Sequence, residues 1–334
     1  MTSGEAVGTV DSAAILEQIA GRVMRDYLGV APGERVLIVV DTRTDPAIAP
    51  ALQAAAAATG GDAIVATILP RPRSGAEPPG PVAAAMREAD VVLCAASTSL
   101  YHTLAKGAAQ RAGTRGVFNA PSRLGAWTVG AMTADFVAIR RQAEQLADLF
   151  RATRTVRVTS PAGTDLRSSI VGRAPMAWLT GICRSPGEVS AFPGGEVSLP
   201  PVEGTSNGRI VWESVASDLG RISEPVRIEV RDGRAVSVHG GREAEVLRRI
   251  LAEVVDADNI AEIGIGLNPA ARISDDITES KKALGTVHLA LGDSANEYGG
   301  LVECEVHLDG LVLHPTVTFD DRVVVADGRH LYVP

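Results

Sequence analysis

The sequence is poor in cysteine and in aromatic residues. Only three cysteines occur among 334 residues, and Cys94, Cys183 and Cys304 are far apart and form no CxxC pair. An odd number of widely spaced cysteines argues against disulfide stapling and against a structural zinc knuckle. Aromatic residues make up only 4% of the chain, while alanine, valine and glycine are abundant.

Long apolar runs and an excess of positive charge are also missing. The longest apolar runs fall well short of the roughly 20 residues that a membrane-spanning helix needs. The N-terminal segment MTSGEAVGTVDSAAILEQIAG has no basic region followed by an apolar run, so we expect no signal peptide and a cytoplasmic location. The net charge of −8 argues against nucleic acid or an anionic membrane surface as the main partner.

What is present in the first part of the chain is an alternation of strand and helix patterns. RVLIVVD at 35–41 is a continuous apolar run, which suits a strand buried on both faces. The alanine-rich segment 46–58 then reads as a helix, and DAIVATIL, DVVLCA and GTRGVFN read as further strands with helices near 82–88 and 101–111 between them. No GxGxxG follows these strands, so no dinucleotide is predicted. The alternation predicts a Rossmann-like parallel α/β domain over residues 1–150.

The pattern changes after a long helix expected at about 133–153. Strand-like stretches then dominate, including GRIVWESVA, PVRIEVRDGRAVSVHG and VVVADGRHLYV, and one helix at 243–255 interrupts them. The pairs Asp232-Gly233 and Asp327-Gly328 are typical of hairpin turns. We therefore place a boundary near Arg151 and expect residues 151–334 to form a mostly antiparallel, β-rich, metal-binding catalytic domain.

Potential metal ligands gather in a short, glycine-punctuated part of this second domain. Three segments, AEIGIGLNPAAR, GTVHLALGDSANEYGG and VECEVHLDG, lie close together, and PGGEV precedes them by about sixty residues. They carry Glu196, Glu262, His288, His307 and Asp309. Oxygen and nitrogen ligands without a thiolate suit Zn, Co, Mn or Fe(II). His307 and Asp309 are two positions apart, so on a strand both side chains point to the same face and reach one ion from a single element.

Three cationic residues also lie between these segments. Arg272, Lys281 and Lys282 flank the potential ligands in sequence. They would be able to pair with a carboxylate of a substrate, but we expect them to form a solvated charge cluster.

The motifs of the second domain together resemble a known family. GTDLRSS, FPGGEVSLPPVEGT, AEIGIGLNP, GTVHLALG and VHLDG occur in the order and rough spacing of the thermophilic-type aminopeptidases (aminopeptidase T-like) of the M29 metallopeptidase family. The resemblance covers most of residues 154–330. In that family two metal ions are held by glutamates, histidines and an aspartate, and the matching positions are Glu196, Glu262, His288, His307 and Asp309. The family's tyrosine shortly after GTxH falls by spacing on Ala295, and Tyr298 is its candidate replacement.

The resemblance implies a metal-dependent hydrolase of an amide or peptide bond. Two divalent ions, Zn, Co, Mn or Fe, would polarise the carbonyl group and activate a water molecule as the nucleophile. Glu196 or Glu262 would accept the proton of that water and return it to the leaving amine, and Tyr298 is a further catalytic candidate. The expected substrate is a small molecule or a peptide, and the resemblance favours a homodimer or a larger homo-oligomer.

A second family resemblance supplies the main alternative. In length and layout the chain is similar to a divergent branch, the 2,5-dihydroxypyridine 5,6-dioxygenases, which keep the HxD pair on a single iron. In that branch the position of Glu262 is a histidine, and the GTxH histidine and the GGE glutamate are missing. Because this chain keeps the hydrolase-like set, ring cleavage is the second hypothesis. A hydrolase of a cyclic or non-peptide amide and a non-catalytic, metal-stabilised scaffold are further alternatives.

Overall fold

The computed structural model describes residues 12–296 and 298–332, and its contacts divide the chain into two compact units. The first unit comprises the chain up to Thr133 together with Ile182–Phe192, and the second comprises Ala134–Gly181 and the chain from Pro193 onward. Residues 1–11, where the segment considered for a signal peptide begins, lie outside the described residues. Within the described part of the chain, no helix is both long and apolar enough to cross a membrane.

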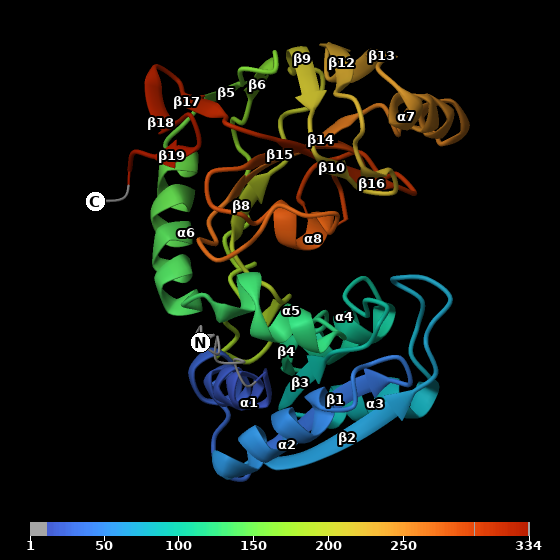
Figure 1. The fold of residues 1–334 in the computed structure, drawn as a ribbon, viewed down its shortest axis with the longest axis vertical. Coiled ribbons are helices and arrows are strands. Elements are labelled where there is room, and N and C mark those ends of the chain that lie inside the picture. The colour runs from blue at the N-terminus through green and yellow to red at the C-terminus, as the bar shows by residue number, and fades with distance from the viewer. Residues whose placement is uncertain (1–11, 297, 333–334) are drawn as a thin grey trace, which may run out of the picture. The chain divides into compact units, whose positions relative to one another are not determined.

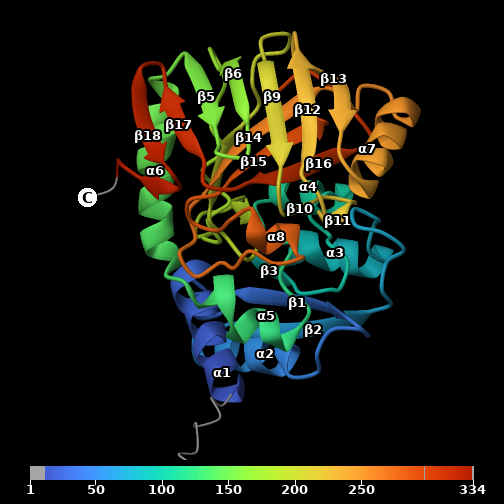
Figure 2. The same ribbon diagram turned by 45° about the horizontal axis from the view of Figure 1, so that its top comes forward.

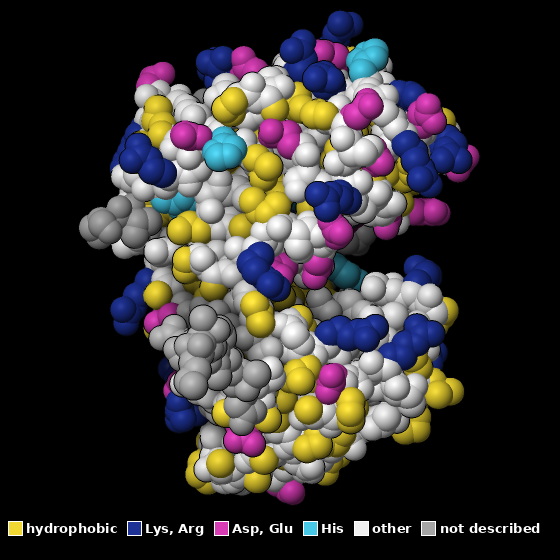
Figure 3. All heavy atoms as spheres, viewed as in Figure 1, with side chains coloured by type: hydrophobic (Ala, Val, Ile, Leu, Met, Phe, Trp, Pro, Cys, Tyr) yellow, Lys and Arg dark blue, Asp and Glu magenta, His cyan; other side chains and the backbone are white. Residues whose placement is uncertain are grey.

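The first unit is built on a parallel sheet with the strand order β2-β1-β3-β4-β7 (Figure 1). Six of the seven residues of β1 are buried, as its unbroken apolar sequence predicts for a strand covered on both faces. Figure 3 shows hydrophobic side chains gathered on the drawn face of this unit, where the alanines of α2 contribute exposed methyl groups. The elements of the unit are α1 (Ser12–Arg22), a π-helical turn (Val23–Tyr27), β1 (Arg35–Asp41), α2 (Ile48–Ala58), β2 (Asp62–Ile68), α3 (Gly80–Glu88), β3 (Val91–Cys94), α4 (Leu104–Arg111), β4 (Arg115–Val117), α5 (Leu124–Thr128), a 3-10 turn (Gly130–Thr133) and β7 (Val189–Ser190).

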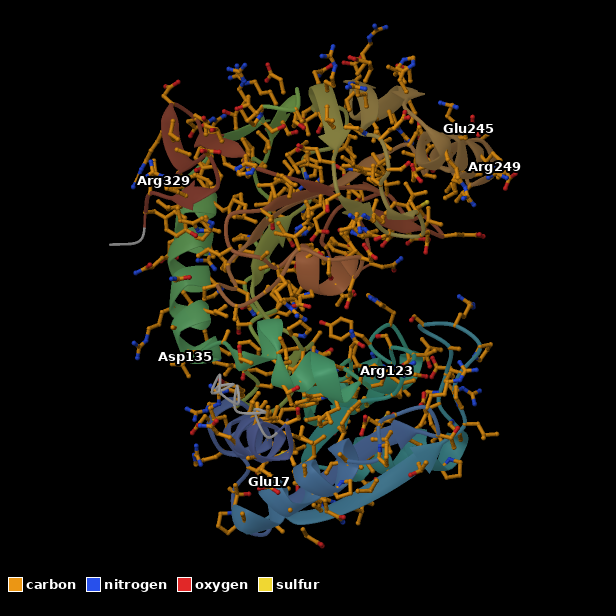
Figure 4. All side chains as sticks on the ribbon, in the orientation of Figure 1. Glu17, Arg123, Asp135, Glu245, Arg249 and Arg329 are labelled. Carbon is orange, nitrogen blue, oxygen red and sulfur yellow. The ribbon has the colours of Figure 1, made fainter. Side chains whose placement is uncertain are left out.

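The division of the chain differs from the boundary expected near Arg151. The two-residue strand β7 pairs in parallel with β4, and this pairing returns a short segment to the first unit. The long helix α6 (Phe136–Arg151) belongs to the second unit. Asp135 caps this helix by accepting hydrogen bonds from the backbone amides of Val137 and Ala138 at 2.9 and 3.2 Å (Figure 4). A strand as short as β7 has no recognisable sequence pattern, so its pairing partner is known only from the structure.

The second unit contains two antiparallel sheets, which confirms the predicted combination of a parallel α/β part and a mostly antiparallel β-rich part. The six-stranded sheet has the order β11-β10-β16-β15-β14-β8, and the eight-stranded sheet has the order β13-β12-β9-β6-β5-β17-β18-β19. Beyond α6, the elements are β5 (Thr155–Thr159), β6 (Asp165–Ser169), β8 (Glu196–Leu199), β9 (Asn207–Trp212), β10 (Val215–Ala216), β11 (Gly220–Arg221), β12 (Val226–Arg231), β13 (Arg234–His239), α7 (Arg242–Glu253), β14 (Ile260–Gly266), α8 (Ile277–Ser280), β15 (Val287–Gly292), β16 (His307–Val312), β17 (Thr316–Phe319), β18 (Arg322–Ala326) and β19 (Arg329–His330).

The helices of this unit bury one face each. In Figures 1 and 2, α6 runs beside β17 and β18, and the rings of Phe150 and Phe319 lie there with their centroids 4.5 Å apart. Helix α7 buries Ala244 and Leu247, while Glu245 and Arg249 are exposed on it (Figure 4). Helices α6 and α7 thus each bury an apolar stripe at helical spacing.

The six-stranded sheet has one apolar face, and this face packs against the eight-stranded sheet. The indole of Trp212 lies against Gly310, where an added Cβ would come within 1.9 Å of the ring, and its Nε1 donates to the carbonyl of Leu289 at 3.1 Å. A β-bulge between Ile260 and Glu262 shifts the register of β14 against β15. Because of this shift Ile260, paired with Leu291, faces the apolar side, whereas Glu262, paired with Ala290, faces the opposite side.

Candidate metal centre

The structure brings all five predicted ligand residues to one face of the six-stranded sheet. We call Glu196, Glu262, His288, His307 and Asp309 the ligand cluster. Four adjacent strands carry it, in the order β16, β15, β14 and β8. Residues that oppose each other across antiparallel strands share a face. Ala290 lies between Glu262 and Asp309 in register, while His288 opposes Gly264 and Glu196 opposes Gly266.

The glycines of AEIGIGL create the space for this arrangement. A Cβ added to Gly264 would lie 1.9 Å from Nε2 of His288, so the imidazole lies directly over the backbone of β14. A glycine inside a strand commonly marks such a close approach. His288 is thereby fully buried and reaches across β14 toward Glu262 and Glu196.

The side-chain atoms of the ligand cluster converge within coordinating reach of one another. Nε2 of His307 lies 2.9 Å from Oε2 of Glu262 and 3.5 Å from Oδ1 of Asp309. Nε2 of His288 lies 3.6 Å from Oε2 of Glu196 and 3.7 Å from Oε1 of Glu262. One ligand atom each from Glu262, His288 and Asp309 lie within 4.8 Å of one another.

Several of these buried atoms have no hydrogen-bond partner. They are both ring nitrogens of His288 and one carboxylate oxygen each of Glu196, Glu262 and Asp309. Buried polar atoms without partners are rare in folded proteins, because each carries the cost of its lost hydration. Unpartnered nitrogen and carboxylate oxygen atoms that converge on one point fit a divalent cation of the Zn, Co, Mn or Fe type.

A backbone contact fixes the orientation of His307. Its Nδ1 lies 2.7 Å from the carbonyl oxygen of Asp293, in the loop after β15. As a donor to that carbonyl, Nδ1 carries the proton, which leaves Nε2 directed at Glu262 and Asp309. Metal-binding histidines are commonly held in this way. Asp293 was not singled out from the sequence, since a backbone acceptor leaves no signal in residue type.

The two lysines are buried in the site, which corrects the expectation of a solvated charge cluster. Nζ of Lys281 lies 3.1 Å from Oδ2 of Asp309 and 3.6 Å from Oε2 of Glu196. Nζ of Lys282 lies 3.8 Å from Oε1 of Glu196 and donates to the carbonyl of Thr278 at 3.0 Å. Their side chains are only 13% and 5% exposed, whereas that of Arg272 is 55% exposed.

Local hydrogen bonds explain why the lysines turn inward. Helix α8, which packs beside β16 and β10 (Figure 1), ends at Ser280, and the chain then folds back in a tight turn. The amide of Asn268 donates to the carbonyl of Lys282 at 2.8 Å, which fixes the turn against the segment that follows β14. Buried ammonium groups require nearby carboxylates, and the three carboxylates of the ligand cluster meet that requirement.

The charges of the site shift one another's pKa values. Burial would raise the pKa of Glu262, but the charge of Lys281 and the nearby imidazoles of His288 and His307 hold it well below its usual range. Burial would lower the pKa of Lys281, yet Asp309, Glu196 and Glu262 raise it well above its usual value. Burial also lowers the pKa of His307, but the Asp309 and Glu262 carboxylates outweigh it and raise that pKa to about 10 in the metal-free site.

Tyr298, the candidate replacement for the aminopeptidase family's tyrosine after GTxH, lies at the site. Its ring stacks on the imidazole of His307 with centroids 4.3 Å apart and planes 5° apart. Burial raises the pKa of its hydroxyl well above the usual value, so the group is protonated at neutral pH. Ala295, the position matched by spacing, instead donates its amide to the carbonyl of Val302 at 3.0 Å.

A partly buried ion pair holds the loop that carries Tyr298. The guanidinium of Arg173 donates to the carbonyl of Gly299 at 3.0 Å and pairs with the carboxylate of Glu203. Glu203 also accepts a hydrogen bond from the amide of Leu301 at 2.8 Å. Arg173 and Glu203 thus secure both sides of the turn that follows Tyr298. Neither residue could be singled out from the sequence, because both lie more than ninety residues before the loop.

Comparison with known proteins shows what the chain is similar to. A family model described as 2,5-dihydroxypyridine 5,6-dioxygenase matches residues 22–332. The curated protein of that name from Pseudomonas putida (strain KT2440) is 27% identical over 199 residues, which are 54% of this chain and 55% of that protein. The matched part therefore spans about half the length of this relative.

Two solved structures share the fold. The 2,5-dihydroxypyridine dioxygenase from Pseudomonas putida KT2440 has a TM-score of 0.82 at 21% identity, over 97% of this chain and 98% of that chain. Wild-type AmpT from Thermus thermophilus has a TM-score of 0.69 at 19% identity, over 95% of this chain and 99% of that chain. At such identities the likeness shows the fold alone, which both proteins share with this chain.

Proposed function

This chain belongs to the 2,5-dihydroxypyridine 5,6-dioxygenase family, and we propose that it is a metal-dependent enzyme that uses Fe(II) to open a hydroxylated, nitrogen-containing aromatic ring. The observation that carries the proposal is the ligand cluster itself, in which two histidines and three carboxylates converge with unpartnered atoms. Two histidines and one carboxylate are the usual ligand set of non-haem iron oxygenases. The substrate in this proposal is a small molecule.

His288, His307 and Asp309 would hold the ion, with Glu262 as the second carboxylate in reach. When bound, Fe(II) would supply open coordination positions for the ring and dioxygen and would relay electrons from the ring, which is the reductant, to the dioxygen whose two atoms enter the product. His307 must give up the proton that the metal-free site favours, so that Nε2 becomes a neutral ligand. The Asp293 carbonyl keeps the other ring nitrogen protonated during this change.

The remaining groups act on the substrate and its protons. An acidic ring hydroxyl would transfer its proton to Oε2 of Glu196, which is buried and has no hydrogen-bond partner. The Lys281 ammonium, 3.6 Å from that oxygen, favours a negative charge on the bound ring. The hydroxyl of Tyr298, which its raised pKa keeps protonated, would donate a hydrogen bond to a ring substituent. Burial of the site keeps competing water out of these contacts.

One observation favours the hydrolase hypothesis as a second candidate. The chain has carboxylates at Glu196 and Glu262 and a histidine at His288, which is the set expected of an amide hydrolase. In that case Oε2 of Glu196 would accept the proton of an attacking water and return it to the leaving nitrogen. A cyclic or non-peptide amide is then the candidate substrate alongside a peptide.

Oxygen consumption separates the two candidates. Protein freed of metal and reloaded with Fe(II) under anaerobic conditions is mixed with 2,5-dihydroxypyridine in an oxygen electrode, and parallel samples loaded with Zn, Co or Mn receive aminoacyl-anilides and cyclic amides. We expect oxygen uptake that matches the loss of the aromatic ring and depends on Fe(II). Amide cleavage without oxygen uptake would overturn the dioxygenase proposal and support the hydrolase.

A pair of histidine variants serves as the internal control. His307→Ala removes a ligand and should abolish turnover of either kind. His314→Asn changes an exposed histidine whose side chain is 71% exposed, and its φ of +49° suits asparagine. This variant should keep wild-type activity. Turnover that survives in His307→Ala would place the active site elsewhere.

A further inference from the structure

We propose that Lys281 is a resident cation that takes the place of a second metal ion, so that this site binds one divalent ion per chain. The inference rests on the proposed metal dependence, and it holds for either candidate reaction. It contradicts the two ions that the aminopeptidase resemblance implies for the same five ligands.

The position of the ammonium group is the first support. Nζ of Lys281 is within 3.1 Å of Asp309 and 3.6 Å of Glu196, which belong to the two outer strands of the four that carry the ligand cluster. Among the remaining members, Oε1 of Glu262 lies 3.7 Å from Nε2 of His288 and Oε2 of Glu262 lies 2.9 Å from Nε2 of His307. The lysine therefore already supplies a positive charge to the two carboxylates that a second ion would have to share.

The balance of charge is the second support. Three carboxylates face the site, and one divalent ion together with the Lys281 ammonium supplies three positive charges. A second divalent ion would leave two excess positive charges in a buried site, even before Lys282 is counted. Like charges this close repel strongly at the effective dielectric of a protein interior, and a two-ion site needs surplus carboxylates to offset this repulsion.

The neighbouring lysine provides a matched comparison. Lys282 is the next residue after Lys281 and is also buried. Its ammonium, however, donates to the Thr278 carbonyl and approaches only one carboxylate of the ligand cluster, that of Glu196, at 3.8 Å. Lys281→Met and Lys282→Met each remove one positive charge from the same region. Only the first removes the cation that bridges Asp309 and Glu196. Lys281→Arg keeps a cation there.

Manganese counting tests the proposal without substrate or oxygen. Metal-free full-length protein is titrated with Mn(II), the bound ions per chain are measured, and electron paramagnetic resonance distinguishes isolated ions from exchange-coupled pairs. We expect one isolated ion per chain for wild type, Lys281→Arg and Lys282→Met. Lys281→Met should bind two ions per chain and show the coupled spectrum.

Several results would overturn the inference. These are two ions in wild type, a single ion in a folded Lys281→Met, or two ions in Lys282→Met but not in Lys281→Met. Thermal melting verifies folding, and if Lys281→Met does not fold, Lys281→Gln replaces it. One bound ion without oxygen uptake would support the inference and reject the dioxygenase, whereas wild type that binds no divalent ion would overturn both.

Discussion

The ring of Tyr298 lies flat on the imidazole of His307, 4.3 Å between centroids and 5° from parallel. The imidazole is thus held on its face by the phenol and at Nδ1 by the Asp293 carbonyl. Two constraints of different kinds leave Nε2 directed at the carboxylates. Preorganisation of this sort reduces the entropy lost when a ligand atom binds an ion.

We therefore expect the two functions of Tyr298 to separate by substitution. Tyr298→Phe keeps the stacked ring and should keep wild-type metal affinity, while any loss of turnover reports on the hydroxyl. Tyr298→Ala removes the ring and should weaken metal binding by about tenfold or more, the usual effect of removing a group that orients a ligand. Metal affinity and turnover of both variants are measured. Equal metal affinities would show that the stacking does not position His307.

Gly264→Ala should disrupt the metal centre. The added Cβ would lie 1.9 Å from Nε2 of His288, so the imidazole must move away. Overpacking of this kind costs about 1–3 kcal/mol of stability, and the displaced histidine should lower metal content. Urea unfolding and metal analysis test both effects.

Gly21→Ala is the matched control for this variant. An added Cβ at Gly21, within α1, meets nothing within 4 Å. Because alanine is the better helix former, this change should stabilise the protein by about 0.5–1 kcal/mol and leave the metal unaffected. A Gly264→Ala protein with full metal content would show that His288 is not a ligand.

The ion pair of Arg173 and Glu203 should act through Tyr298. Arg173→Met frees the Gly299 carbonyl and leaves Glu203 without its cationic partner, so the turn after Tyr298 loosens. We expect a loss of metal affinity similar to that of Tyr298→Ala. The double variant should be no worse than either single one, since coupled residues give non-additive effects.

An exposed ion pair supplies the control for this cycle. Arg157 and Asp165 are each 54% exposed and 2.8 Å apart, and pairs of this type contribute about 0–1 kcal/mol. Arg157→Met should therefore leave metal binding unchanged. Additive losses in the Arg173→Met, Tyr298→Ala double variant would show that the ion pair does not work through the tyrosine.

Stability at mildly acidic pH should depend on His330. Burial lowers the pKa of this imidazole from 6.5 to about 4, and its Nδ1 lies 2.9 Å from the hydroxyl of Tyr332. The unfolded chain therefore binds the proton first as the pH falls. The stability linked to this group is present above pH 6.5 and is lost as the pH falls from 6.5 toward 4.

His330→Leu removes this proton-binding group. We expect the variant to lose less unfolding free energy than wild type between pH 6.5 and 4, measured by urea unfolding. His314→Asn, at an exposed histidine, should show the wild-type loss. The same loss in His330→Leu as in wild type would show that the imidazole is not held neutral in the folded protein.

The strand and helix patterns in the sequence were sufficient for the fold class. The apolar run of β1 and the two-residue spacing in VHLDG reflect local periodicity, which survives in the structure. The ends of helices were less well predicted: α6 covers Phe136–Arg151 rather than 133–153, since Asp135 starts it. The pairing of β7 with β4 is a long-range contact that no local sequence pattern predicts.

The same distinction applies to the site. The five ligand residues could be proposed because histidine, glutamate and aspartate side chains are themselves metal ligands. Lys281 and Lys282 were misjudged, because a lysine in a polar segment is usually solvated, and only the turn after α8 shows that they point inward. Asp293 acts through its backbone carbonyl, and Arg173 acts through a loop that is distant in sequence.

One extra residue in β14 determines on which side of the sheet the Glu262 carboxylate lies. The bulge between Ile260 and Glu262 turns the first residue toward the core and the second toward the ligands. Apart from Glu262 and Gly264, which the metal centre needs, this strand should therefore tolerate a change of residue type better than a change of length. Deletion of Ala261 would remove the bulge. Either Ile260 would then face the polar side of the sheet, or Glu262 would face the apolar core. In an alignment of relatives, a gap within 260–266 would mark a protein that has lost this centre, whereas gaps in the turns around it would carry no such meaning.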